Sequence, residues 1–226
     1  KPFHAGKAAF NGVLAAELAA SGFVPSLALL EPEGSMALSL VQDRSHALSS
    51  ADFDEGWEVL RNTFKPYACC LLTHATIDAG RALAARVAGR DIARVEAVVN
   101  PLAIHLAGKP APVTPLEGKF STAYCASLAL LGHAATQADF TAARLADPAL
   151  RALTAKVVLQ PDAAQTETSA RMVVVLGDGS RIEETVALAR GNPGNPMAWD
   201  DLRAKFMPLV EPKLGGEDAA ALFACL

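Results

Sequence analysis

The amino-acid sequence predicts an α+β fold in which both ends of the chain are helical and a mixed lobe lies between them. Apolar residues recur at helical spacing toward both ends of the 226 residues, whereas β-branched runs gather in the middle. Alanine is in excess, which favours closely packed helices. The simplest architecture is one helical domain, contributed by residues 1–63 and 191–226, with residues 64–190 inserted as a separate α+β lobe.

The first stretch is expected to be helical. A helix is predicted over residues 6–21, because its apolar side chains recur three or four positions apart. Gly22 follows at the position where a left-handed residue ends a helix. A second helix is predicted over 50–64, with Ser49 as its N-cap. The residues between the two helices, 25–40, carry proline and glycine and indicate a loop with short turns.

The middle lobe mixes helices with strands. Helices are predicted over three of its segments, 73–87, 119–133 and 148–155. The last of these has Asp147 as its N-cap and proline at its first position. A strand is predicted over 94–100, where β-branched residues gather. Two further strands, 171–176 and 181–188, flank a central Asp-Gly, which is a strong hairpin signal.

The last stretch returns to helix after residues 191–196, which are rich in glycine, asparagine and proline and form the expected linker. Helices are predicted over 199–210 and 217–225. Trp57 and Trp199 are expected to anchor helix packing.

Composition excludes several classes of protein. The formal net charge of -4 argues against a general nucleic-acid binder, which would carry a basic surplus. No run approaches the ~18 apolar residues of a membrane span, so no membrane partner is expected. Four cysteines do not make a disulfide scaffold in a chain of this length. A reducing, cytoplasmic setting is therefore expected.

Common catalytic and metal-binding motifs are missing from the sequence. It has no Walker loop, no Gly-x-Ser-x-Gly elbow and no His-Glu-x-x-His helix. Cys69 and Cys70 are adjacent and so lack the spacing of zinc ligands, and Cys125 and Cys225 add no second pair. We therefore expect a protein that works without a metal.

Three polar segments remain in otherwise apolar surroundings. The first, residues 1–7, places two lysines and His4 beside the free N–H groups of a helix start, which suits a carboxylate ligand. A solvated helix start explains the same residues without a ligand.

The second segment, residues 64–74, places Lys65 and Tyr67 near an apolar run and His74 at a helix N-terminus. A helix N-terminus favours the neutral imidazole, which is the form that a general base needs. A histidine that caps its own helix or is satisfied in the core is the alternative.

The third segment, residues 117–124, precedes an apolar helix in which Lys119, Ser121 and Tyr124 stand out. Ser121 and Tyr124 are three apart and share one side of a helix. Tyr124 is suited to donating a proton or holding a carboxylate. It also has the character of an ordinary amphipathic core residue, so both interpretations stay open.

Taken together, four segments resemble the MmgE/PrpD family, which includes 2-methylcitrate dehydratase, cis-aconitate decarboxylase and iminodisuccinate epimerase. They read KPFHAGKAAFNGVLAAELAASGF, FKPYACCLLTHATIDA, EGKFSTAYCASLALL and GNPGNPMAWDDLRAKF. The resemblance implies a helical domain with an inserted α+β lid, a homodimer, no metal and no organic cofactor. It also implies small di- or tricarboxylate substrates bound in the cleft between helical domain and lid.

The same resemblance implies roles for particular residues. Lys1, His74 and Tyr124 match the family's active-site lysine, histidine and tyrosine, and we expect them to be catalytic. His4, Lys65 and Lys119 fall within the motifs and are expected to bind substrate carboxylates. On this reading His74 is the base or acid, Lys1 binds or polarises a carboxylate, and Tyr124 donates a hydrogen bond or a proton.

One departure separates this sequence from the family pattern. Family members also carry an N-terminal helical half with an acidic residue and further histidines of the active site, and that half is not in this sequence. We therefore expect this chain to hold part of the site, to need the N-terminal half as its partner, and to lack turnover alone. A non-catalytic remnant or binding module with the same fold is the rival interpretation. Dehydratase, decarboxylase and epimerase chemistry are not distinguished.

Overall fold

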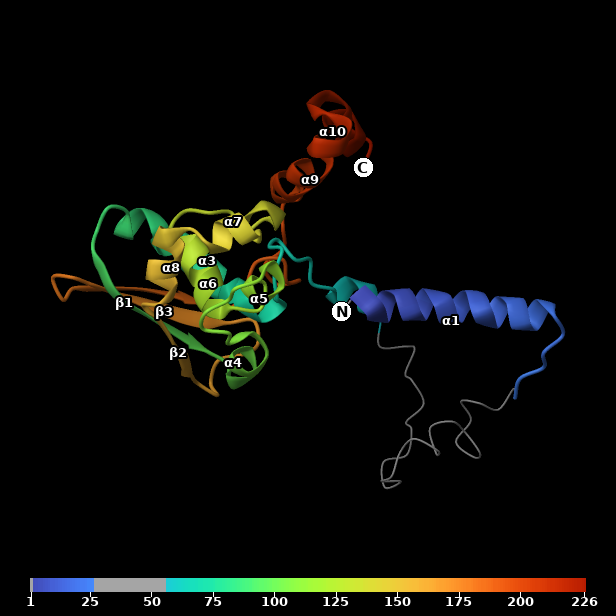
Figure 1. The fold of residues 1–226 in the computed structure, drawn as a ribbon, viewed down its shortest axis with the longest axis horizontal. Helices are drawn as coiled ribbons and strands as arrows, with labels where there is room; N and C mark the ends of the chain where they lie inside the picture. The colour runs from blue at the N-terminus through green and yellow to red at the C-terminus, as the bar shows by residue number, and fades with distance from the viewer. Residues whose placement is uncertain (1, 27–55) are drawn as a thin grey trace, which may run out of the picture. The chain divides into compact units, whose positions relative to one another are not determined.

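The computed structural model describes residues 2–26 and 56–226 (Figure 1). The chain divides into two units, residues 1–56 and 57–226. In the first unit, helix α1 (Pro2–Ala20) confirms the helix predicted over 6–21, although it begins four residues earlier. Gly22 follows it with a φ of +90°, as its predicted capping role requires. The predicted loop over 25–40 lies almost entirely outside the described residues.

The helix predicted over 50–64 is only partly within the described residues, and there the prediction is wrong. Residues 58–61 form a single 3₁₀ turn, Glu58–Arg61, with no buried residue. A helix is stabilised chiefly by packing its apolar face, and this segment packs none. Trp57 is 75% exposed, so the expectation that it anchors helix packing is also wrong. Ser49, the predicted N-cap, lies outside the described residues.

The α+β lobe is built on a four-stranded sheet of order β2-β1-β3-β4. Its strands are β1 (Ile92–Val99), β2 (Val157–Pro161), β3 (Ala170–Leu176) and β4 (Arg181–Val186). β1 pairs in parallel with β2 and antiparallel with β3, which forms a hairpin with β4. The three predicted strands are confirmed, and β2 is an addition. β2 is short, half-buried and ends at a proline, so it lacks the alternation that marks a strand in sequence.

Helices α3 (His74–Val87), α6 (Thr122–Leu130) and α8 (Pro148–Thr154) cover one face of the sheet (Figure 1). All three confirm predicted helices, with α6 shorter at both ends. The core between helices and sheet includes Leu83, Val95 and Met172, each fully buried.

Within this layer α3 and α6 approach closely. A Cβ added at Gly80 of α3 would lie 2.7 Å from the Cβ of Ala129 in α6, so only glycine fits without a shift. Three short helices that the sequence pattern did not predict connect these elements, α4 (Pro101–Ala107), α5 (Pro115–Gly118) and α7 (Ala142–Leu145). Each is too brief to show a helical period, and their capping residues are the stronger signal.

The chain enters and leaves the α+β lobe at two adjacent segments. The Phe64 N–H donates to the carbonyl of Gly191 at 2.8 Å, and the Thr63 hydroxyl donates to the side-chain carbonyl of Asn192 at 3.0 Å. We call residues 63–66 and 189–195 the junction. Gly191 has a φ of +92°, and a Cβ there would lie 1.9 Å from the Phe64 carbonyl oxygen.

Two helices follow the junction, α9 (Trp199–Leu214) and α10 (Gly216–Ala224), which confirms both helices predicted at the C-terminal end. They pack on each other through Trp199, Phe206 and Phe223, with Trp199 edge-on to Phe223 at 6.1 Å between ring centroids. No helix in the described ranges is both long enough and apolar enough to cross a bilayer.

Candidate active site

The second and third polar segments lie against each other in the α+β lobe. The Cys70 N–H donates to the carbonyl of Lys119 at 2.9 Å, and the Ala68 N–H donates to the carbonyl of Ala135 at 3.0 Å. These backbone hydrogen bonds hold residues 64–74 against the two segments that flank α6, one before its start and one after its end. Two motifs separated by more than forty positions in the sequence therefore form one wall of a candidate site.

His74 is the first residue of α3 and is completely buried. Neither of its ring nitrogens has a hydrogen-bond partner among the described residues. The ring is edge-on to that of Tyr67, with 5.2 Å between centroids. Buried polar atoms are nearly always paired, so two unpaired nitrogens in one ring indicate a position kept for a ligand, a water or another part of the protein. A neutral imidazole can accept a proton at one nitrogen and donate one at the other.

A cluster of buried thiols adjoins this histidine. The Cys69 Sγ lies 3.1 Å from the Thr73 Oγ1, and the Cys125 thiol points at the Gly118 carbonyl at 3.7 Å. The neighbouring Cys125 thiol lowers the pKa of Cys69, and the same contact together with burial raises the pKa of Cys125. His74 also lowers the pKa of Cys69, although burial opposes this. The cluster is thus polar and titratable inside an apolar core.

A network that the sequence analysis did not predict holds Tyr67 in place. The Tyr67 hydroxyl donates to one oxygen of the Asp78 carboxylate. The other oxygen accepts a hydrogen bond from the backbone N–H of Arg190 at 2.8 Å. Burial, then the charge of Asp78, raises the pKa of Tyr67. One signal was present in the sequence: Asp78 is the only acidic residue in the α3 segment, four positions after His74. Nothing in the sequence connects it to Tyr67 or Arg190.

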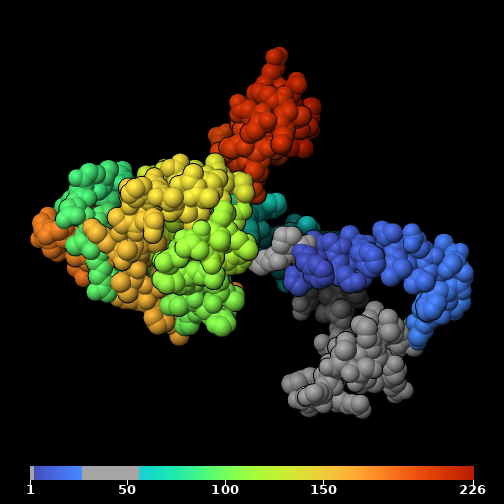
Figure 2. All heavy atoms as spheres, viewed as in Figure 1, coloured from blue at the N-terminus to red at the C-terminus, as the bar shows by residue number. Residues whose placement is uncertain are grey.

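Tyr124 lies in the core. Its hydroxyl donates to the Asp139 carbonyl at 2.7 Å, its ring is edge-on to Phe140, and burial raises its pKa. Ser121 does not pair with the Tyr124 side chain, because its hydroxyl oxygen accepts the Tyr124 N–H at 3.2 Å as the N-cap of α6. The ring also lines a cavity of about 540 Å³ between residues 110–113 and helices α7 and α8, and His74 does not line that cavity. In Figure 2 the yellow surface of α7 adjoins the light-green surface that precedes α6.

The two lysines of these motifs are held by polar contacts near the surface. Lys65 is exposed, and its ammonium group donates to the Cys69 carbonyl at 3.2 Å. Lys119 donates to the side-chain carbonyl of Gln137 at 2.7 Å and lies over the Phe140 ring. Both contacts are with neutral acceptors, so the positive charges of both lysines stay available to an anion.

The first polar segment belongs to the other unit of the chain. His4 is exposed in the first turn of α1, next to the Phe3 ring, and Lys7 lies over the ring of Phe10. Lys1 lies outside the described residues. The structure therefore brings His74, Lys65, Lys119 and Tyr124 into one lobe and does not test the predicted roles of Lys1 and His4.

Within residues 2–26 and 56–226, no three His, Cys, Asp or Glu side chains are grouped so as to hold a metal ion. The sequence model of one protein family, the MmgE/PrpD C-terminal domain, matches residues 67–225 of the chain. A search of curated proteins gave no significant match. The matched range starts at Tyr67 and so includes the histidine, the thiol cluster and the Tyr67–Asp78 network.

Proposed function

The chain belongs to the MmgE/PrpD family, and from this premise we propose that it is the C-terminal part of a lyase or isomerase that acts on small di- or tricarboxylates without a cofactor. The reaction is proton transfer at a carbon next to a carboxylate, as in 2-methylcitrate dehydration. Residues 64–190 form the lid in this proposal, and residues 1–63 and 191–226 belong to the helical domain.

The observation that carries the proposal is the unpaired imidazole of His74. Its burial excludes bulk water, and neither nitrogen makes a hydrogen bond in the described chain, although the Cys69 thiol adjoins the ring. A general base must reach its proton within hydrogen-bond distance and must not be occupied by another acceptor or donor. We assign His74 as the acid or base that takes the proton from the substrate carbon and returns one to a leaving hydroxyl group or to the carbon.

The surrounding residues take supporting roles. Lys65 and Lys119 supply positive charge for substrate carboxylates, and such charge stabilises the enolate-like transition state next to a carboxylate. Tyr124 supplies a hydrogen bond or a proton after its bond to Asp139 is exchanged. Lys1 and His4 complete the site from the helical domain, together with the N-terminal half of the enzyme and a second copy in a homodimer.

The test is turnover of citrate-like acids, followed by ¹H NMR in deuterated water. The chain alone is expected to show none, and the same chain with a family N-terminal helical half is expected to dehydrate, decarboxylate or epimerise at least one acid. His133→Gln serves as the control. Unlike His74, His133 is only partly buried, and its Nδ1 has a neighbour at 3.8 Å, an oxygen of the Asp139 carboxylate. Turnover by this chain alone, or none by the complete protein with any acid, contradicts the proposal.

A further inference from the structure

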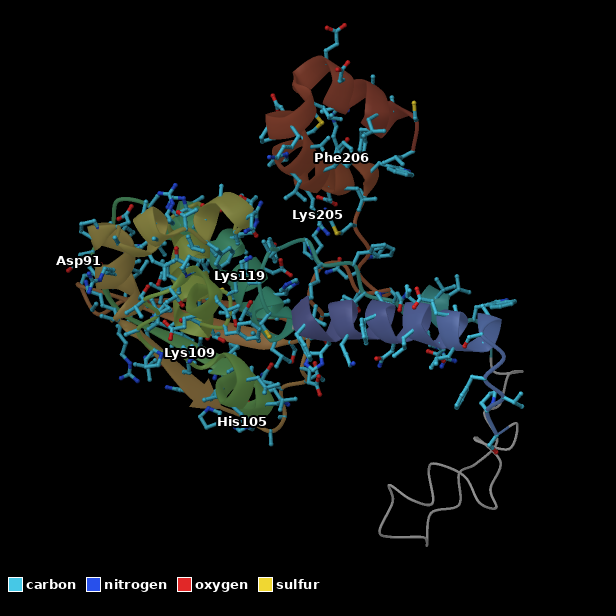
Figure 3. All side chains as sticks on the ribbon, turned by 45° about the vertical axis from the view of Figure 1, so that its right-hand side comes forward. Asp91, His105, Lys109, Lys119, Lys205 and Phe206 are labelled. Atoms are coloured by element: carbon cyan, nitrogen blue, oxygen red, sulfur yellow. The ribbon has the colours of Figure 1, made fainter. Side chains whose placement is uncertain are left out.

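Two of the four cysteines are neighbours in space, although more than fifty positions separate them in the sequence. Cys69 lies in the segment before α3 and Cys125 lies in α6, and their side chains belong to one cluster of the core. The Cys70 N–H donates to the carbonyl of Lys119, which Figure 3 labels just before α6, and this bond holds the two segments together. Both sulfurs are free thiols. The fold therefore brings two thiols together from different elements, which is the first requirement for a disulfide.

The two sulfurs differ in protonation. The neighbouring Cys125 thiol, the His74 ring and the Thr73 hydroxyl lower the pKa of Cys69 to about 5, although burial opposes them. The Thr73 Oγ1 lies 3.1 Å from the Cys69 sulfur. Lys65 adds positive charge nearby, because its ammonium group donates to the Cys69 carbonyl at 3.2 Å. The contact with Cys69 and complete burial raise the pKa of Cys125. At neutral pH the pair thus holds one thiolate and one thiol.

The two sulfurs also differ in access. Cys69 is 7% exposed, whereas Cys125 is completely buried. An oxidant as small as hydrogen peroxide therefore meets Cys69 first, and the thiolate is the form of cysteine that reacts. Cys70 is as exposed as Cys69 but packs in another cluster of the core. Low exposure alone therefore does not single out Cys69, and its neighbours do.

We propose that Cys69 and Cys125 form a reversible redox pair, which closes into a disulfide when a hydroperoxide oxidises Cys69. The Cys69 thiolate attacks hydrogen peroxide, so that an S–O bond forms, the O–O bond breaks and hydroxide leaves. The Cys125 sulfur then attacks the resulting sulfenic acid. An S–S bond forms, the S–O bond breaks, and the hydroxyl group leaves with the Cys125 proton as water. The two sulfurs are oxidised and the peroxide oxygens are reduced.

The disulfide would change the surroundings of the candidate base. It removes the negative charge of the sulfur that adjoins His74, and it takes that sulfur away from the Thr73 hydroxyl as a partner. The redox state of the pair would thereby act on proton transfer by His74. This consequence rests on the function proposed above, whereas the redox pair itself does not.

The test maps disulfides in the chain itself and needs no substrate. Protein carrying Cys225→Ser, which removes the exposed thiol, is treated with hydrogen peroxide, and the remaining thiols are alkylated in denaturant. Trypsin should release residues 62–81 joined to residues 120–144 by a disulfide that dithiothreitol reverses. In Cys125→Ser the disulfide should be absent, and Cys69 should accumulate as sulfenic acid that dimedone traps.

The pH dependence of the rate is a second readout. At low peroxide concentration, where the first step limits the rate, disulfide formation should differ by less than about twofold between pH 6 and pH 8, because Cys69 is a thiolate at both. An ordinary thiol with a pKa of ~8.5 would react about seventyfold more slowly at pH 6 than at pH 8.

Cys70→Ser is the matched control, since it removes an equally exposed thiol next to Cys69. It should keep the disulfide and its rate of formation. Three results overturn the proposal: no link between the two peptides in the folded protein, a link that Cys70→Ser abolishes, or a seventyfold fall in rate from pH 8 to pH 6. Far-UV circular dichroism checks the folding of each variant, and the peptide map before substitution of Cys70 or Cys125 decides if a variant does not fold. Turnover by the complete protein, or its absence, does not bear on these results.

Discussion

The hydroxyl of Tyr67 donates a hydrogen bond to the carboxylate of Asp78, four positions after His74 on α3. Positions four apart share one face of a helix, so Tyr67 lies against both side chains at once. Its ring contacts the His74 ring, and its hydroxyl reaches Asp78, which also binds the Arg190 N–H. The junction and the candidate base are thereby connected through one side chain.

Replacing Tyr67 by phenylalanine is expected to destabilise the α+β lobe by about 1.5–3 kcal/mol, the value typical of a hydrogen bond to a charged group. Tyr124→Phe removes a hydrogen bond to a neutral carbonyl and should cost less, about 1 kcal/mol. Urea denaturation of both variants measures the difference. A smaller loss for Tyr67→Phe than for Tyr124→Phe would show that the Asp78 contact does not stabilise the fold.

Gly80→Ala tests the close approach of α3 and α6. The added methyl group would lie 2.7 Å from the Ala129 Cβ, and overpacking of this kind costs about 1–3 kcal/mol. Gly12→Ala in α1 is the control, because a Cβ there meets nothing within 4 Å. Alanine should stabilise that helix by up to about 1 kcal/mol. Thermal unfolding should move in opposite directions for the two variants, and equal shifts would contradict the packing described.

Gly191→Ala tests the junction. Its φ of +92° and the 1.9 Å approach to the Phe64 oxygen act together, so we expect a loss of about 2–5 kcal/mol. Gly89→Ala separates the two effects, since Gly89 also has a positive φ but has open space around it. It should lose only the conformational part, about 1–2 kcal/mol. Chemical denaturation yields both values, and equal losses would mean that the junction tolerates a side chain.

Glu117 makes the stability of the α+β lobe depend on pH in the acid range. The Val113 and Thr114 N–H groups donate to its carboxylate and hold the pKa of Glu117 below its usual value. The unfolded chain therefore binds the proton more tightly, so this contribution to stability is complete above the unfolded pKa of ~4.3 and is lost as the pH falls through the lower folded pKa.

The variant Glu117→Gln removes this dependence. Its melting temperature should fall less than that of the unmodified protein between neutral pH and the acid range. Glu167→Gln is the control, because Glu167 is exposed and takes part in no hydrogen bond with the described residues. Parallel melting curves for Glu117→Gln and the unmodified protein over this range would refute the assignment.

Much of the fold follows from local signals. The spacing of apolar residues predicted α1, α3, α9 and α10, and the Asp-Gly turn predicted the β3–β4 hairpin, because these elements are long or carry turn chemistry of their own. β2 and the short helices were missed because their stability comes from neighbours distant in sequence. The prediction of a helix over 50–64 failed for a related reason. The described part of this segment buries no residue against the rest of the protein, so nothing stabilises a helix there.

The candidate site was predictable in part. The motif placed His74 at a helix start and Lys65 near an apolar run, and the structure adds that His74 is buried and that its ring nitrogens make no hydrogen bond in the described chain. The network around Tyr67 was not predictable. Asp78 reaches the Tyr67 hydroxyl only once α3 has formed, and Arg190, whose backbone N–H binds Asp78, lies more than one hundred residues further along the chain. In the sequence, Tyr124 fitted both a functional residue and a core residue. In the structure it is buried, and its hydroxyl donates to the Asp139 carbonyl.

The central claim is that His74 moves a proton at a carbon next to a carboxylate. Its most direct test is the exchange of that carbon-bound hydrogen for deuterium, measured by NMR on citrate-like acids with the protein that includes the N-terminal half. We predict exchange by the unmodified protein and by His133→Gln, and a loss of ~10²–10⁴-fold in a folded His74→Gln variant. Exchange in His74→Gln at the rate of the unmodified protein would contradict the claim.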